Sequence, residues 1–152
     1  MASFIGRLTG SSNVHLNFRK LALAVGPGGL KTAVTAGAIP IQNAWKEKVP
    51  VDTGTYRRSV HIGGITQPEE GGNDGHVKQR EPLPEPELDA DHVLVTIGTD
   101  IIDPPYPWFL EDGTAHMAAQ PSAQPAWDET KDKAQEEIGA VLRIRLEAAG
   151  KL

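Results

Sequence analysis

The fold is decided at residues 50–60, which read Pro50-Val51-Asp52-Thr53-Gly54-Thr55-Tyr56-Arg57-Arg58-Ser59-Val60. A helical pattern precedes this stretch, and a strand-like alternation follows it. Pro50 lacks a backbone donor and disfavours helical geometry at the residue before it. Gly54 permits a positive φ, and Asp52 and Thr53 can bond nearby backbone groups. The sequence therefore predicts a stiff corner, built by Pro50, Asp52, Thr53 and Gly54, where a helix ends and a strand begins.

The same corner has a competing, chemical interpretation. Asp52-Thr53-Gly54 is the signature triplet of aspartic proteases, and small proteases of this kind are homodimers whose two Asp residues share a proton. That mechanism needs a buried apolar strand before the triplet, whereas here the preceding residues are polar and broken by Pro50. We expect no enzyme activity, and the homodimeric aspartic protease is the alternative.

Two amphipathic helices are predicted, one before the corner and one at the end of the chain. The first covers 29–48, with Gly37 expected to weaken it and Pro40 to bend it. The second begins near Ser122, which is predicted to cap it, and runs to about Ala149. The apolar stripe of the first recurs at spacings of three and four, at Leu30, Val34, Ala38, Ile41 and Trp45. The apolar stripe of the second is Trp127, Ala134, Ile138, Val141 and Leu142.

Strands are predicted over 57–66 and 92–99, paired antiparallel, and 106–114 is predicted to be an aromatic-rich edge. Within that edge, Trp108 and Phe109 are either core residues or anchors of a subunit contact. The fold class is therefore α+β, an antiparallel sheet covered by two main helices. At 152 residues the chain forms a single domain, 1–152, with a flexible N-terminal arm over 1–16.

Charge is distributed unevenly along the chain. Residues 1–66 carry a net charge of +6, residues 67–91 carry −6 and residues 92–152 carry −5. The 67–91 stretch is rich in Pro and Gly and is predicted to be a mobile acidic loop or hairpin extension. A two-signed molecule suits head-to-tail packing of identical subunits, although an acidic loop that only maintains solubility explains the charges equally well. A pI near 5.5 argues against nucleic-acid binding as the main role.

The sequence offers no pattern for a cofactor or a metal. There is no cysteine, and the five histidines lack the spacing of metal ligands. The glycines at 26–29 are not followed by the Lys-Ser/Thr of a phosphate loop. No apolar run approaches the roughly 18 residues of a membrane span. We therefore predict no catalytic residues, no cofactor, no metal and no membrane partner.

Three pieces of sequence occur in a defined order. The first is the corner, the second runs from Tyr106 to Thr114, and the third opens the last helix. Together they resemble the small tail-completion and head–tail joining proteins of long-tailed bacteriophages over roughly residues 28–145. The matched residues are Pro50, Val51, Thr53, Gly54, Arg57 and Ser59, then Tyr106, Glu111, Gly113 and Thr114, then Pro121, Pro125 and Ala126. The departures are Tyr56, Val60, Pro107, Leu110 and Ser122.

The resemblance implies a structural virion protein assembled in the bacterial host cytoplasm. Such tail terminator, tail completion or neck proteins form a ring, commonly a homohexamer, that caps the tail tube and joins it to the head connector. The implied partners are further copies of the chain, the tail tube protein and the head-completion or connector protein, and genomic DNA passes through the ring without sequence-specific binding. The subunit-interface candidates are Arg57, Arg58, Trp108, Phe109, Glu111 and Asp112. We expect Arg57 and Arg58 to meet acidic groups of a neighbour, either in 81–91 or at Glu111-Asp112.

Overall fold

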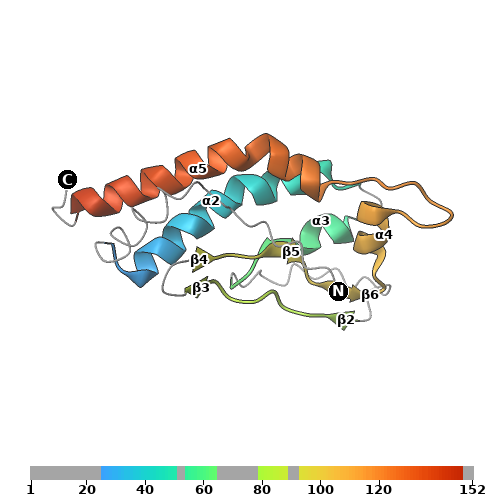
Figure 1. Cartoon of the computed structure of the whole chain (residues 1–152). Coiled ribbons are helices and arrows are strands. Elements are labelled where there is room, and N and C mark those ends of the chain that lie inside the picture. The colour runs from blue at the N-terminus through green and yellow to red at the C-terminus, as the bar shows by residue number, and fades with distance from the viewer. Residues whose placement is uncertain (1–24, 51–53, 65–78, 89–92, 149–152) are drawn as a thin grey trace.

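The computed structural model describes residues 25–50, 54–64, 79–88 and 93–148, and the fold class is α+β as predicted (Figure 1). The predicted arm at 1–16, the corner residues Asp52 and Thr53, and parts 67–78 and 89–91 of the acidic stretch lie outside these residues. The elements in chain order are α2 (Pro27–Lys48), α3 (Thr55–Ser59), β1 (Val60–Ile62), β2 (Gln79–Arg80), β3 (Glu87–Leu88), β4 (Val93–Leu94), β5 (Ile97–Thr99), β6 (Ile101–Asp103), α4 (Tyr106–Asp112) and α5 (Ala123–Ala148).

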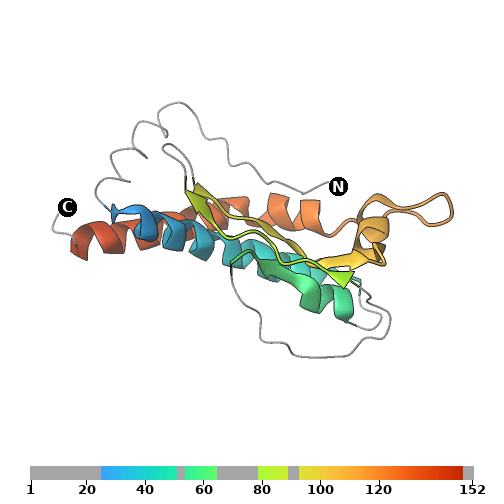
Figure 2. The ribbon, with the colours of Figure 1, turned by 90° about the horizontal axis from the view of Figure 1, so that it is seen from below.

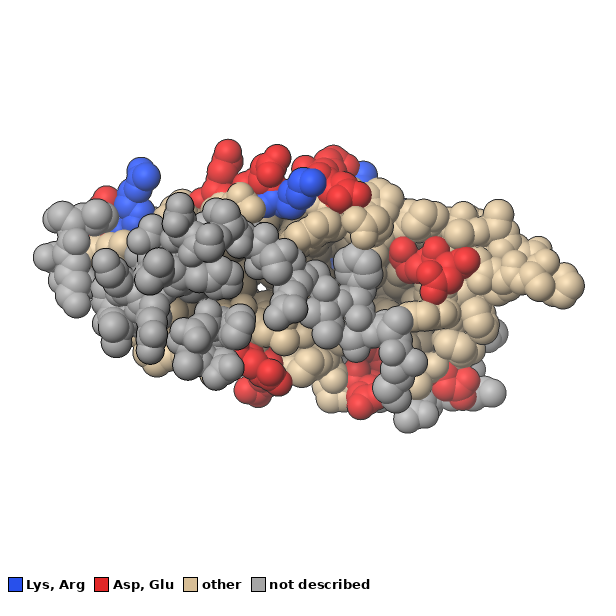
Figure 3. Space-filling model, in the orientation of Figure 1, with Lys and Arg blue, Asp and Glu red and all other residues tan. Residues whose placement is uncertain are grey.

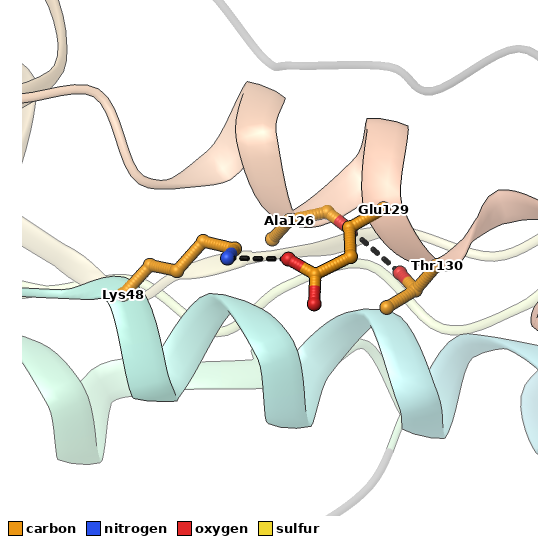
Figure 4. A network of polar contacts seen from close by, with 4 residues as sticks. All are labelled: Lys48, Ala126, Glu129 and Thr130. Carbon is orange, nitrogen blue, oxygen red and sulfur yellow. Dashed lines mark hydrogen bonds and ion pairs between the residues drawn. The ribbon is translucent and has the colours of Figure 1, made fainter.

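Helices α2 and α5 lie side by side and run antiparallel (Figures 1 and 2). Near the end of α2, Lys48 Nζ lies 2.5 Å from Glu129 Oε2 on α5, as Figure 4 shows. Near its start, Gly29 lies against the side chain of Arg145. On its other side α2 contacts β1, β3 and β4, so it forms the layer between α5 and the strands.

The core lies between these layers and forms two clusters. The first joins α2, the corner and the start of α5, and the second lies towards the start of α2. The predicted stripes contribute Leu30, Trp45 and Leu142 to these clusters, and both predicted helices are confirmed. The clusters are Ala44, Trp45, Val49, Tyr56, Val60, Ala123 and Ala126, and Leu30, Ala33 and Leu142.

Gly37 has a role in the packing of the two helices. A Cβ atom built at this position would lie 2.5 Å from Ile138 Cγ1 and 2.8 Å from the carbonyl oxygen of Ala134. The sequence predicted only that Gly37 weakens α2, but the missing side chain is what lets α5 approach. The helix also continues through Pro40, since one missing donor does not end a helix that packs along its whole length.

The strands are short and antiparallel. β1 pairs with β5 in the register Val60↔Thr99 and Ile62↔Ile97, which confirms the predicted pairing of 57–66 with 92–99. β2 pairs with β6, and β3 pairs with β4. The stretch 93–103 therefore contributes one strand to each of the three ladders.

Two predicted strand segments are helical instead. Residues 55–59 form α3, because Gly54 adopts φ 78° and its carbonyl oxygen accepts the N–H of Arg58, which closes a helical turn. The predicted strand 57–66 is thus a strand only from Val60 to Ile62. The predicted edge at 106–114 is helix α4, in which Pro107 falls in the first turn, where a missing N–H costs nothing. The predicted strand 92–99 is interrupted at 95–96.

The described part of the acidic stretch, residues 79–88, is packed on the strands, and we call it the strap. The strap lies against glycines, whose missing side chains leave space for it. Pro84 lies against Gly63, and a Cβ atom built at Gly98 would lie 3.2 Å from Leu83 Cδ2. The prediction of a mobile loop is therefore wrong for 79–88, which contains β2 and β3. The alternative prediction of a hairpin is confirmed at β3 and β4, which pair antiparallel.

Changing Gly37 to Ala should destabilise the protein although Ala is the better helix former. The propensity gain is about 1 kcal/mol, while forcing a methyl group into a closed contact costs about 1–3 kcal/mol. Gly139→Ala on α5 is the matched control, because nothing lies within 4 Å of its added Cβ, and it should be stabilising. Urea unfolding of both variants measures the difference, and equal stabilisation by the two would contradict the close approach at Gly37.

Candidate functional site

The three sequence pieces meet at one side chain, the half-buried carboxylate of Glu111 on α4. From α3, Tyr56 Oη donates a hydrogen bond of 2.8 Å to Glu111 Oε1. At the start of α5, the backbone N–H groups of Ser122 and Ala123 donate hydrogen bonds of 2.9 and 3.2 Å to Glu111 Oε2. The hydroxyl of Ser122 also donates to Oε1. We call this set of bonds the Glu111 network.

The Glu111 network extends to α2 through Ser122. The indole Nε1–H of Trp45 donates to Ser122 Oγ at 3.0 Å, and Ser122 is buried. The hydroxyl of Ser122 thus accepts a hydrogen bond from Trp45 on α2 and donates one to Glu111 on α4. Sequence analysis placed Trp45 only in an apolar stripe, and nothing in a single sequence marks a bond between residues 77 positions apart.

Glu111, rather than Ser122, caps the start of α5. Sequence analysis predicted Ser122 as the capping residue, but its hydroxyl is used by Glu111. A carboxylate is the better partner here, because it accepts several N–H groups and its negative charge faces the positive end of the helix dipole. The cap is therefore supplied from another helix and fixes α4 against α5.

Tyr56 stays a hydrogen-bond donor in this environment. Burial of its ring raises the pKa of Tyr56 well above the usual 10.0, and the charge of Glu111 raises it further. The ring also packs edge-on against Tyr106, with centroids 6.3 Å apart. The phenol is therefore held neutral between α3 and α4.

A second group of bonds fixes α3 and β1 to the rest of the sheet. Ser59 Oγ donates to the carbonyl oxygen of Tyr56 at 2.8 Å and lies 2.6 Å from Thr99 Oγ1 on β5. Gln42 Nε2 on α2 donates to the carbonyl oxygen of Val60 at 3.0 Å. Ser59, a matched motif residue, thus joins the end of α3 to the neighbouring strand.

The predicted interface residues separate into two kinds. Glu111 accepts hydrogen bonds within its own chain, and its contact with a neighbour's arginine stays a prediction. Asp112 on α4 and the pair Arg57 and Arg58 on α3 are exposed. They remain on the surface beside the Glu111 network.

Trp108 and Phe109 are exposed at 43% and 41% of their surface. The interpretation of these two side chains as core residues is therefore wrong. Half-exposed aromatic side chains are typical of binding surfaces, which leaves them as contact candidates. Of the four corner residues, the structure describes Pro50 and Gly54. Pro50 is half-buried, and the φ angle of Gly54 lies in the left-handed region.

Within the described ranges, no three His, Asp or Glu side chains gather closely enough to hold a metal ion. In the same part of the chain, no helix is long and apolar enough to cross a membrane. Asp52, the residue on which the protease alternative depends, is not among the described residues.

Replacing Tyr56 by Phe should change how stability depends on pH. Because the folded protein raises the pKa of Tyr56, its contribution is complete below the unfolded value near 10 and is lost as the pH rises above it. The wild-type free energy of unfolding should therefore fall by up to about 1.4 kcal/mol per pH unit more steeply than that of Tyr56→Phe. Urea unfolding from about pH 8 to about pH 11 tests this. Parallel curves would show that Tyr56 ionises freely in the folded state.

Comparison with known proteins returned no family model, no curated protein and no solved structure that matches this chain.

Proposed function

We propose that this chain is a structural protein of a tailed bacteriophage virion, which forms a ring at the head–tail junction. In this role, as a tail terminator, tail completion or neck protein, it caps the tail tube and joins it to the head connector. Its partners are other copies of itself in a ring of six, the tail tube protein and the head-completion or connector protein. Genomic DNA passes through the ring without sequence-specific contacts.

The observation that carries the proposal is the convergence of the three sequence pieces. They lie far apart in the chain, yet the corner supplies Tyr56, the second piece supplies Glu111 and the third supplies the N–H groups at 122–123. The three pieces that resemble one family therefore meet at one joint, in which Glu111 is a matched residue and Tyr56 and Ser122 are departures. Such a joint supports the proposal because the resemblance implies a shared structural unit rather than three chance matches.

The surface around the joint supports assembly through unlike surfaces. Arg57 and Arg58 are exposed on α3, while the exposed acids of the strap lie on a separate segment of the chain: Glu81, Glu85 and Glu87. Opposite charges at separate places favour a head-to-tail contact, in which each copy uses both surfaces. Repeated head-to-tail contacts close into a ring when the rotation between neighbouring copies is a whole fraction of a full turn.

Measurement of particle mass and negative-stain electron microscopy test the ring directly, with Asp52→Asn as the discriminating variant. A structural subunit should assemble equally well with Asp or Asn at this position. An aspartic protease should lose all peptide cleavage on the same change, because one carboxylate of the shared pair is gone. Cleavage that depends on Asp52, in a particle no larger than a dimer, would overturn the proposal.

Reversing the charge of Arg57 and Arg58 to Glu should weaken assembly. The variant places two acids where we expect the acidic groups of a neighbour, and like charges repel. Lys131→Glu with Lys133→Glu is the matched control, since it makes the same change in charge on the exposed surface of α5. Sedimentation at low and high salt measures the effect, which salt should reduce. Equal assembly of the two variants would exclude α3 from the contact.

A further inference from the structure

The outward face of α2 carries an uncharged stripe. Thr32, Ala36, Ile39 and Asn43 follow one another at spacings of four, three and four, so they lie on one side of the helix. Ile39 is exposed at 46% of its surface, and Thr32 and Asn43 are exposed too. No Asp, Glu, Lys or Arg occurs from residue 32 to residue 45. We call these four residues the α2 stripe.

The neighbouring helix has the opposite character. The exposed positions of α5 between Asp128 and Glu147 are mostly Asp, Glu, Lys and Arg, and Figure 3 shows these charges along its outer side. Helices that face water normally carry such charged and polar residues. Thr32, Ile39 and Asn43 are exposed like these positions of α5, yet none of them is charged. The α2 stripe therefore lacks the charge that the exposed face of α5 carries.

A second uncharged surface lies at one end of the molecule. The connection between α4 and α5, residues 113–121, projects beyond α4 (Figure 1), and the exposed Trp108 and Phe109 lie on α4 beside it. We call 113–121 with these two aromatic residues the tip. The sequence 113–127 holds no Asp, Glu, Lys or Arg, and His116 is its only titratable side chain. Figure 3 shows the projecting loop itself without charged atoms, with an acidic patch next to it.

The tip is held in one shape by its own backbone. Thr114 and Met117 exchange backbone hydrogen bonds, and the N–H of Gln120 donates to the carbonyl oxygen of Leu110 at 2.7 Å. Gly113 has φ 78°, and a Cβ there would lie 2.8 Å from the nitrogen of Ala119. A loop that is already ordered loses little conformational entropy when it binds, which favours a role in contact.

We propose that the tip of one copy of this chain seats on the α2 stripe of the next copy. A charged surface covered by the tip would lose its hydration without gaining a partner, so the surface that fits the tip is uncharged. The α2 stripe is such a surface on the same chain, with Ile39 as the counterpart of Trp108 and Phe109. The contact deepens the proposed ring and rests on it.

The two surfaces lie on different elements, so their contact joins unlike faces. Each copy then donates one tip and accepts one, so no copy in a closed ring is left with an uncovered tip or an uncovered α2 stripe. A two-fold dimer would form the same pair twice, with each tip on the other copy's stripe, and would close at two copies. The number of copies linked through the contact therefore distinguishes the two arrangements.

Cysteine cross-linking tests the pairing, and the chain is suited to it because it contains no cysteine. One preparation carries Ile39→Cys and a second, with a size tag, carries Phe109→Cys. The two are mixed at high protein concentration and oxidised, and the size of each disulfide-linked product identifies the pair. The control replaces Ile39→Cys by Gly139→Cys, an exposed position on α5.

The contact predicts a mixed 39–109 product, at least tenfold more abundant than the 139–109 product, and a ladder of linked copies from the double variant. Dominant 39–39 or 109–109 products would overturn the contact, and a double variant linked only into dimers would overturn the ring in favour of a two-fold dimer. Particle mass measured on the same samples separates this inference from the proposed function. A ring without the 39–109 link would overturn the contact alone, and a monomer at every concentration would overturn both.

Discussion

The arrangement of the helices depends on one half-buried carboxylate. Removing the charge of Glu111 from water costs free energy, and the cost is offset only because donors from α3 and α5 surround it. The same bonds help decide where α4 lies, because α4 has no side-chain cap at its start and Pro107 is its one fully buried residue. Trp108, Phe109 and the projecting connection to α5 therefore have a defined direction on the surface.

Much of the fold could be predicted from the sequence, and the errors have identifiable causes. The stripes of α2 and α5 have a clear helical period over many turns, so both helices and their ends are found. The segment 106–114 has no such period, since Pro107 and three aromatic side chains hide a helix of two turns. The pairing of β1 with β5 was predicted, but the helical turn at 55–59 depends on Gly54, whose conformation no pattern reveals.

The candidate site was harder to predict, because its residues acquire their roles from partners distant in the chain. Glu111 looked like a surface acid, Trp45 like one more apolar residue and Ser122 like a local cap. Each of these interpretations follows from neighbours in sequence, whereas the bonds join residues 11, 55 and 77 positions apart. The absence of charge over 113–127 and 32–45, by contrast, can be read directly from the sequence, but only the structure shows which residues of the two stretches are exposed.

The way the strap is held divides the molecule into two parts of unequal local stability. Its acidic side chains face water, and its place on the strands depends on the small size of Gly63, Gly64 and Gly98 rather than on a buried apolar face of its own. Such a segment opens at a smaller free energy than the helical layer, so amide hydrogens of 79–88 should exchange with deuterium earlier than those of α2. The strap can therefore open and rearrange while α2 and α5 stay folded.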